Sequence, residues 1–309
     1  MSSQMVTIEQ ATWAWIDAAG KKHSAPLGKR FVKAIMAGFL LSMGGMLTQI
    51  LSSDPWLATN APGLLKIIQG CAFPVGLVMI VLLQAELVTS EMAIFIISTM
   101  KRRVPYWAFL YGWAITFVGN LVGSLLYASV LVHFSGIYTP DMATGAAHGA
   151  ESKMSVNFLK IFLRGIGCNV LVCIAVFQAS LAKDVISKIV AAWFPIATFV
   201  SAGFDHVVAN MFIIPEGLLT GKVTMFGTGE YIWKSVIASF LGNTVGAAFL
   251  VVPLVYLYGG DEFDPARTVD GNSSVEGTIH NVQLQPSTVD RSKVWSSQDV
   301  EKQISHQSS

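Results

Sequence analysis

Six apolar stretches, each long enough to cross a lipid bilayer, constrain the fold of this 309-residue chain more than any other feature. A helix needs about 20 mostly apolar residues to span the hydrocarbon layer. Only 13% of the residues are charged, whereas soluble domains usually carry about 25%. The stretches are 31–52, 64–83, 105–133, 155–181, 189–204 and 229–258, with short apolar pieces at 92–100 and 207–215. The sequence therefore predicts an all-α membrane protein with six transmembrane helices.

Residues 1–30 predict a short amphipathic helix that lies along the membrane surface. Thr7 and Gln10 have the spacing of a capping box. Four apolar residues then share one helical face: Ile8, Ala11, Trp15 and Ala18. Gly20 is expected to end the helix. A basic start followed by an apolar run is missing, so we expect no cleavable signal peptide.

The net charge of +1 hides an uneven distribution. Residues 259–309 hold eight acidic and four basic residues, a net charge of −4, which leaves +5 for residues 1–258. This polar segment lacks helical periodicity, so we expect a disordered cytoplasmic tail after a transmembrane domain of residues 31–258. The overall balance gives no support for a nucleic-acid partner, which would need a basic surface.

Basic residues in the short loops predict the orientation in the membrane. One side carries most of them: Lys21, Lys22, Lys29, Arg30, Lys101, Arg102, Arg103, Lys183 and Lys188. The loops of the other side carry Lys153 and Lys222. Because basic loops stay in the cytoplasm, we expect both termini there, in a multi-pass protein of the plasma membrane.

Two sequence matches indicate that the chain repeats itself. Gly119–Gly123 (GNLVG) recurs as Gly242–Gly246 (GNTVG), 123 positions later. Lys33–Gly38 and Lys160–Gly165 each begin with lysine and end with glycine, at an offset of 127. With three spans in each half, the second half enters the membrane inverted, as in many transporters. The small residues of the first match favour close helix packing.

The middle span of each half is interrupted by polar residues, at 84–91 and at 201–210. Irregular backbone at membrane depth is tolerated only where protein buries it or where it lines a cavity. An ionisable residue there is a candidate functional residue, which singles out His206, with Thr89 at the other break. We expect Glu86 and Asp205 to structure the loops by binding their backbone. Two helix N-termini meeting at this depth would suit an anion.

Three basic residues at the start of the fourth span have helical spacing: Lys153, Lys160 and Arg164. We expect them to share one helical face that runs inward from the external side. They could reach lipid head groups or raise the local concentration of anions. For Lys160 and Arg164 the sequence favours neither role.

Three runs of residues at and near the breaks resemble a known family. Residues 203–212 read GFDHVVANMF, residues 85–90 read AELVTS, and residues 168–176 read CNVLVCIAV. These runs are similar to signatures of the formate–nitrite transporter family, and the resemblance covers roughly residues 1–258. The chain looks most like the nitrite transporters of filamentous fungi. The resemblance implies an aquaporin-like protomer, an inverted 3+3 repeat with helices two and five broken, and a homopentamer with one pore through each protomer.

The resemblance also assigns five residues to the substrate pathway: His206, Thr89, Asn169, Asn210 and Lys153. It places Leu77 and Phe73 at one apolar constriction and Phe199 at the other. Val88 stands where the family has phenylalanine, and Asp205 where it has glutamate. Because of these two departures, the resemblance alone does not establish which anion the chain selects.

The function implied is proton-coupled transport of a small monovalent anion. We expect nitrite as the main substrate, with formate or another short monocarboxylate as the alternative. A neutral-solute channel of the water or glycerol type is less favoured, because the breaks lack paired Asn-Pro-Ala motifs. Metal-ligand and hydrolase motifs are missing, so we expect no enzyme, cofactor or metal site. The proton, which could come from His206 or from bulk water, and the lipid bilayer are the other expected partners.

Overall fold

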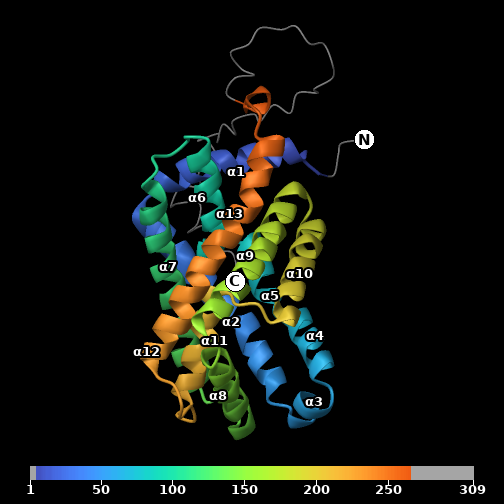
Figure 1. Ribbon diagram of the computed structural model, residues 1–309, viewed down its shortest axis with the longest axis vertical. Coiled ribbons are helices and arrows are strands. Elements are labelled where there is room, and N and C mark those ends of the chain that lie inside the picture. The colour runs from blue at the N-terminus through green and yellow to red at the C-terminus, as the bar shows by residue number, and fades with distance from the viewer. Residues whose placement is uncertain (1–4, 266–309) are drawn as a thin grey trace, which may run out of the picture. The chain divides into compact units, whose positions relative to one another are not determined.

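The computed structural model describes residues 5–265, which lie within one compact unit built almost entirely from helices (Figure 1). Residues 266–309, which make up most of the predicted tail, lie outside the described residues. Residues 259–265 are held against the helices: Lys101 Nζ bonds Asp261 at 2.8 Å and Arg103 Nη2 bonds Asp264 at 2.7 Å. The folded part therefore continues past residue 258, the predicted end of the transmembrane domain.

Within residues 5–265, six helical segments are long and apolar enough to cross a membrane, as predicted. They are α2 (Leu27–Ser52), α4 with α5 (Pro62–Ala72 and Val75–Leu82), α7 with η1 (Ala108–Leu126 and Tyr127–Phe134), α9 (Phe158–Leu181), α10 (Val185–Ala202), and α12 with η2 and α13 (Thr228–Glu230, Tyr231–Ile237 and Ala238–Tyr258). This arrangement confirms the predicted all-α membrane fold.

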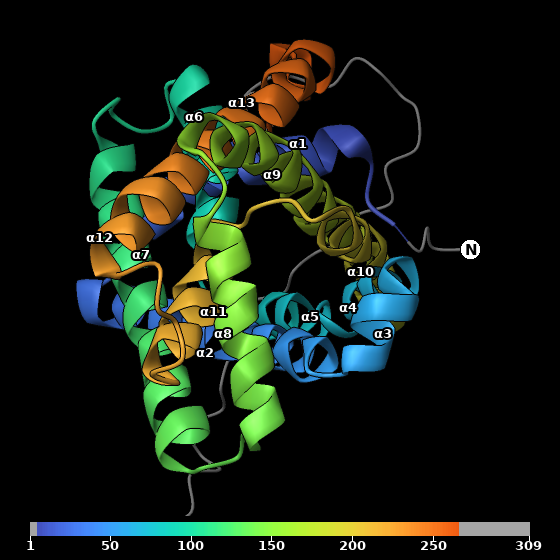
Figure 2. The ribbon, with the colours of Figure 1, turned by 60° about the horizontal axis from the view of Figure 1, so that its bottom comes forward.

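Two 13-residue half-helices, α6 (Val88–Met100) and α11 (Val207–Leu219), follow the breaks in the second and fifth spans. α6 runs toward the side where α1 and the end of α13 lie, which we call the terminal side (Figure 1). α11 runs toward the opposite side, where α3 (Pro55–Asn60) and α8 (Pro140–Met154) lie, which we call the far side (Figure 2). The opposite directions are those of an inverted repeat.

The breaks themselves are shorter than predicted, at residues 83–87 and 203–206. Thr89 and Asn210 were predicted to lie in the breaks but belong to the half-helices. Their side chains are buried there and have hydrogen-bond partners. Each break has a residue in the left-handed region near its start: Gly203, the first residue of its break, has φ 76°, and Gln84, the second residue of its break, has φ 52°. These two residues are 119 positions apart and occupy equivalent places in the repeat.

Close helix packing shows how the two halves correspond. α2 packs on α7, and α9 packs on α13. A Cβ on Gly123 would collide with the carbonyl oxygen of Ile35, and one on Gly246 would collide with that of Ile166. The first helices of the two halves therefore correspond at an offset of 131 rather than 127, so the predicted match between Lys33–Gly38 and Lys160–Gly165 is wrong by one helical turn.

The predicted amphipathic helix is α1 (Ile8–His23), and it packs on the transmembrane helices rather than facing a membrane surface with its apolar side. The Thr7 capping box forms as predicted. Trp13 and Ile16 are buried, and α1 contacts α6 and α9. The helix continues past Gly20 and ends three residues later, at His23. One glycine lowers helix stability by about 1 kcal/mol, and this packing offsets that loss.

Candidate functional site

The N-termini of the two half-helices meet at a hydrogen bond between His206 and Thr89. His206 Nε2 lies 3.0 Å from Thr89 Oγ1, and both side chains are buried. His206 is also the N-cap of α11, where its Nδ1 accepts a hydrogen bond from the Ala209 N–H at 3.0 Å. Because Nδ1 accepts, the ring proton lies on Nε2, which donates to Thr89. The ring is thus held neutral, with a donor at the junction of the two half-helices.

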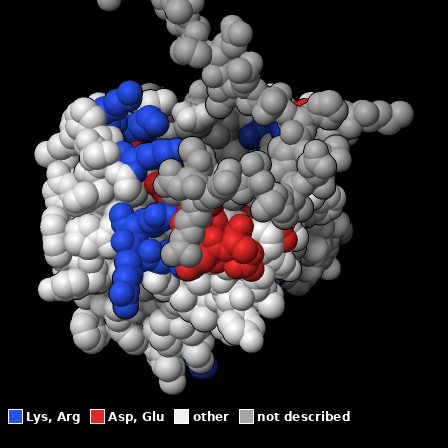
Figure 3. Space-filling model, turned by 90° about the horizontal axis from the view of Figure 1, so that it is seen from above, with Lys and Arg blue, Asp and Glu red and all other residues white. Residues whose placement is uncertain are grey.

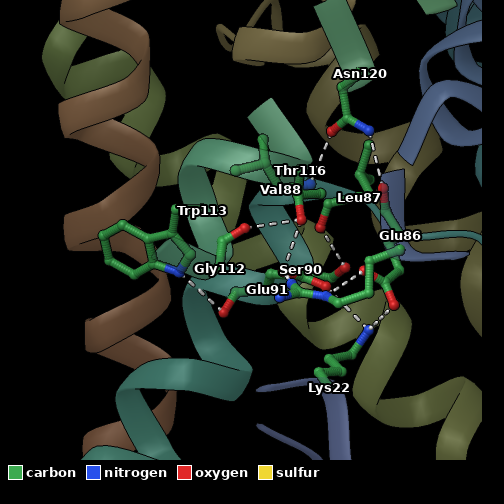
Figure 4. A network of polar contacts seen from close by, with 11 residues as sticks. Lys22, Glu86, Leu87, Val88, Ser90, Glu91, Gly112, Trp113, Thr116 and Asn120 are labelled. Atoms are coloured by element: carbon green, nitrogen blue, oxygen red, sulfur yellow. Dashed lines mark hydrogen bonds and ion pairs between the residues drawn. The ribbon is translucent and has the colours of Figure 1, made fainter. Parts of the chain in front are cut away.

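The first break is held by Asn120 of α7, a residue that the sequence indicated only as part of a packing motif. Its Oδ1 accepts from the Val88 N–H at 2.9 Å. Its Nδ2 donates to the carbonyl of Glu86 at 2.9 Å (Figure 4) and also to the carbonyl of Ala34 at 2.8 Å. Asn120 therefore provides a hydrogen-bond partner for the first N–H of α6, for one carbonyl of the break and for one carbonyl of α2.

Asn243 of α13 holds the second break in the same way. Its Oδ1 accepts from the Val207 N–H at 3.0 Å, and its Nδ2 donates to the carbonyls of Asp205, at 3.0 Å, and Gly165, at 2.8 Å. The prediction that the carboxylates of Glu86 and Asp205 bind the loop backbone is therefore wrong. Their carbonyl groups are the bound atoms, and the binding side chains are the two asparagines of the repeated Gly-Asn-x-x-Gly motif.

The Glu86 carboxylate instead belongs to a terminal-side ionic cluster with Lys22, Arg30 and Glu91. Arg30 lies 3.3 Å from Glu86 and 3.1 Å from Glu91, while Lys22 lies 3.4 Å and 3.0 Å from the same two carboxylates. Thr116 Oγ1 donates to Glu91 at 2.9 Å. Burial lowers the pKa of Lys22, but the carboxylates of Glu91 and Glu86 outweigh this and raise it above its ordinary value. The sequence marked Lys22 and Arg30 only as loop charges.

The Asp205 carboxylate lies in a far-side ionic cluster with Lys153 and Arg164. Lys153 Nζ is 2.9 Å from Oδ1, Arg164 Nη1 is 4.0 Å from Oδ2, and Asn210 Nδ2 is 3.4 Å from Oδ1. Lys153 lies in the last turn of α8 and Arg164 lies in α9, so the prediction of one shared helical face is wrong. Asn157 caps a new helix between them. The sequence did not predict α8, because its alanine- and glycine-rich stretch is neither long nor apolar enough to resemble a span.

Two predicted pathway asparagines are buried and hydrogen-bonded, and Asn169 connects the two halves. Asn169 of α9 donates to the carbonyls of Thr89, at 3.1 Å, and Asn243, at 2.7 Å. Asn210 of α11 donates to Ser235 Oγ at 2.9 Å as well as to Asp205. Asn169 therefore lies beside the His206–Thr89 junction, whereas Asn210 lies behind the far-side cluster.

Two cavities approach this junction from opposite sides. A cavity of about 610 Å³ opens on the terminal side and includes Leu77 in its lining. A cavity of about 530 Å³ opens on the far side and is lined by Phe73, Phe199 and His206. The rings of Phe73 and Phe199 meet edge to face at 5.7 Å, and Phe199 stacks on His206 at 5.9 Å.

These contacts change the predicted grouping of the constriction residues. Of the three residues, Phe73 and Phe199 line the far-side cavity, and Leu77 lines the terminal-side cavity. Apolar side chains thus line both cavities near the His206–Thr89 junction, Phe73 and Phe199 on the far side and Leu77 on the terminal side. A small anion can approach from either side under the attraction of cations and of helix N-termini, but a bare charge would be costly at the apolar rings.

Comparison with known proteins identifies the family of this chain. The profile of the formate/nitrite transporter family matches residues 9–258. The chain is 35% identical over 250 residues to a probable formate transporter of Methanothermobacter thermautotrophicus, which covers 76% of this chain and 90% of the relative. It is 30% identical over 279 residues to the formate channel FocA of Haemophilus influenzae, which covers 81% of this chain and 93% of the relative.

Among solved structures, the fold resembles a pentameric formate channel with formate bound. The TM-score is 0.67 at 25% sequence identity, and the match covers 75% of this chain and 96% of that channel. The family profile, the relatives and the solved structure all point to the same family. The chain therefore belongs to the formate/nitrite transporter family, a family of membrane transporters and channels rather than of enzymes.

Proposed function

We propose that this protein carries formate, or another short monocarboxylate, across the plasma membrane, with nitrite as a second substrate. The predicted preference for nitrite is reversed, because the relatives described above are named for formate. The observation that carries the proposal is the His206–Thr89 junction between two cavities, with Phe73 and Phe199 beside it. Formate and nitrite are both small anions of weak acids with two oxygen atoms, so a pathway of this kind should admit both.

The proposed transport is coupled to protons. An ionised side chain at the bilayer centre costs about 2.5–3.5 kcal/mol on insertion scales, whereas a neutral acid avoids this penalty at the apolar rings. Nδ1 of His206 accepts the Ala209 N–H, so the ring can bind a second proton only by breaking the cap of α11. We therefore assign His206 the role of a hydrogen-bond donor to the permeating group and water in the cavities the role of proton source.

The terminal side faces the cytoplasm in this proposal, and both ends of the described chain lie on it. Lysine and arginine side chains gather on this face (Figure 3), which agrees with the excess of basic residues expected for cytoplasmic loops. The far side is then external. The pentameric relative supports a homopentamer with one pathway in each protomer.

Uptake of isotopically labelled formate and nitrite tests the proposal, with the protein expressed in cells that lack other carriers for them. We expect saturable uptake of both, faster for formate at equal concentration, and faster as the external pH falls. His206→Phe should abolish it, because phenylalanine offers neither the donor to Thr89 nor the cap of α11. Uptake equal to that of cells without the protein would overturn the proposal, and full activity of His206→Phe at acidic pH would remove the role of the histidine.

A further inference from the structure

The lining of the terminal-side cavity carries far more positive than negative charge. Glu86 is the one carboxylate of this lining among the described residues, and it is paired with Lys22 and Arg30. Four further lysines line the cavity: Lys21, Lys29, Lys33 and Lys188. Their side chains make no ion pair or hydrogen bond within residues 5–265. Because Glu91 balances the second cation of the ionic cluster, the charge of these four lysines is left over.

α2 begins at the edge of this cavity. Its N-cap is Pro26, which has no side-chain acceptor, and the N–H groups of Leu27, Gly28 and Lys29 make no hydrogen bond within the described residues. Pro26 and Lys29 are part of the cavity lining. The N-terminus of a long helix carries the equivalent of about half a positive charge. These N–H groups therefore add to the attraction that the lysines exert on an anion.

A buried donor in the first turn of α2 also lacks a partner. Arg30 is 1% exposed, with Nε 3.3 Å from Glu86 and Nη2 3.1 Å from Glu91. Its third nitrogen, Nη1, is buried and has no hydrogen-bond partner within the described residues. A buried charged donor without an acceptor is costly. Since Arg30 lines the cavity, an anion bound there can supply the acceptor.

We propose that the terminal-side cavity binds a polyvalent, phosphate-bearing anion, held by the four lysines and the N-terminus of α2, with Nη1 of Arg30 as a further donor. A phosphate monoester carries a charge of about −1.5 to −2 at pH 7 and three acceptor oxygens, so two phosphates match the charge of four lysines. Formate carries a single negative charge. The cavity volume of about 610 Å³ is that of a site for a larger molecule.

An anion bound at the lysines obstructs the terminal-side approach to the His206–Thr89 junction. The cavity extends from Lys21 and Lys29, which are exposed, to Leu77, which is buried. The lysines therefore lie at the open end, and an occupant there separates Leu77 from solvent. This consequence rests on the proposed function, whereas the binding itself does not.

Isothermal titration calorimetry of the purified full chain tests the binding. Two sources share the proposed chemistry, so the probes are inorganic pyrophosphate and dioctanoyl-phosphatidylinositol bisphosphate. The same short-chain lipid without the added phosphates is the control ligand. Lys33→Gln and Lys188→Gln should each weaken binding about fivefold, the effect of one basic residue near a phosphorylated surface. Lys160→Gln is the matched control, because Lys160 is exposed and lines neither cavity.

The two probes separate the sources. Lipid binding at least tenfold tighter than that of pyrophosphate assigns the site to a lipid head group, and similar or weaker lipid binding assigns it to a free diphosphate. The absence of saturable binding for both probes would overturn the site. An equal loss in Lys160→Gln, or equally tight binding of the control lipid, would do the same. If Lys33→Gln does not fold, Lys188→Gln gives the same comparison.

Formate uptake into inverted membrane vesicles tests the obstruction, since their outer face is the terminal side in the proposed orientation. Added pyrophosphate should slow uptake by the wild type and by Lys160→Gln at lower concentrations than it slows uptake by Lys33→Gln. Unchanged uptake at a pyrophosphate concentration that saturates binding would overturn the obstruction. Wild-type vesicles that take up no formate even without pyrophosphate would overturn the proposed function and not the site, which calorimetry tests separately.

Discussion

The two breaks share one hydrogen-bonding plan but carry different charges. Asn120 and Asn243 each bind one N–H and two carbonyls at matching positions. The charges around these identical frames differ in burial. Arg30 and Glu91 are 1% and 0% exposed, whereas Lys153 and Arg164 are 26% and 45% exposed.

This difference indicates a division of roles between the halves of the repeat. The buried terminal-side cluster balances its cations with carboxylates, and it ties α1 and α2 to α6. The more open far-side cluster has two cations near one carboxylate. The duplicated frame thus holds the backbone in both halves, while a single exchange between carboxylate and amide, Glu91 against Asn210, changes what each cluster can do.

The largest expected effect comes from removing either asparagine of the frame. Asn120→Ala leaves the Val88 N–H and the carbonyls of Glu86 and Ala34 without this partner. At about 1–3 kcal/mol for each buried unsatisfied group, we expect a loss of roughly 3 kcal/mol or more. Asn243→Ala should lose a similar amount, and thermal unfolding of the purified protein measures both.

Asn60→Ala is the control, because that exposed side chain bonds only the carbonyl of Trp56 within the described residues. Its unfolding temperature should stay close to that of the wild type. A large loss for one frame asparagine and none for the other would show that the two breaks are not held in the same way.

An intermediate effect should separate the two clusters. Glu91→Gln keeps the side-chain shape but leaves Arg30 buried with Glu86 as its remaining carboxylate. Breaking a buried pair costs about 3–5 kcal/mol, and we expect the lower end because Glu86 stays. Asp205→Asn should cost about 1 kcal/mol or less, because its partners are partly exposed to solvent. Equal losses in chemical unfolding would contradict the difference in burial between the clusters.

The smallest effect concerns the backbone at the start of each break. Gln84 and Gly203 both have positive φ, a region that costs a residue with a Cβ about 1–2 kcal/mol. Gln84→Gly should therefore stabilise the protein slightly, and Gly203→Ala should destabilise it by about 1 kcal/mol. Unfolding midpoints of the two variants should move in opposite directions, and a shared direction would mean that the turns are not equivalent.

The sequence was most informative where the lipid bilayer restricts which residues a segment can contain. The six spans could be predicted because a bilayer requires long apolar helices. His206 and Thr89 could be singled out because polar residues are costly at that depth unless they have a function or a partner. Asn120 and Asn243 carried a signal as well, since both repeat within Gly-Asn-x-x-Gly, but packing glycines explained the motif equally well until their hydrogen bonds were known.

Other features depend on contacts between distant segments. Lys22 and Glu91 are 69 positions apart, and no local pattern pairs them. The helix break that places Lys153 and Arg164 on different helices occurs in an ordinary polar stretch. The grouping of Phe73 with Phe199 depends on how α4 lies against α10.

The sequence by itself determined the membrane fold, the inverted repeat and the two polar breaks, because length, hydropathy and duplication are properties of the chain that do not depend on packing. Only the tertiary structure decided which side chains hold the breaks, which charges neutralise one another and which side chains line each cavity. Ionic and hydrogen-bonding interactions act over a few ångströms, so their partners are set by the packed helices and not by distance along the sequence.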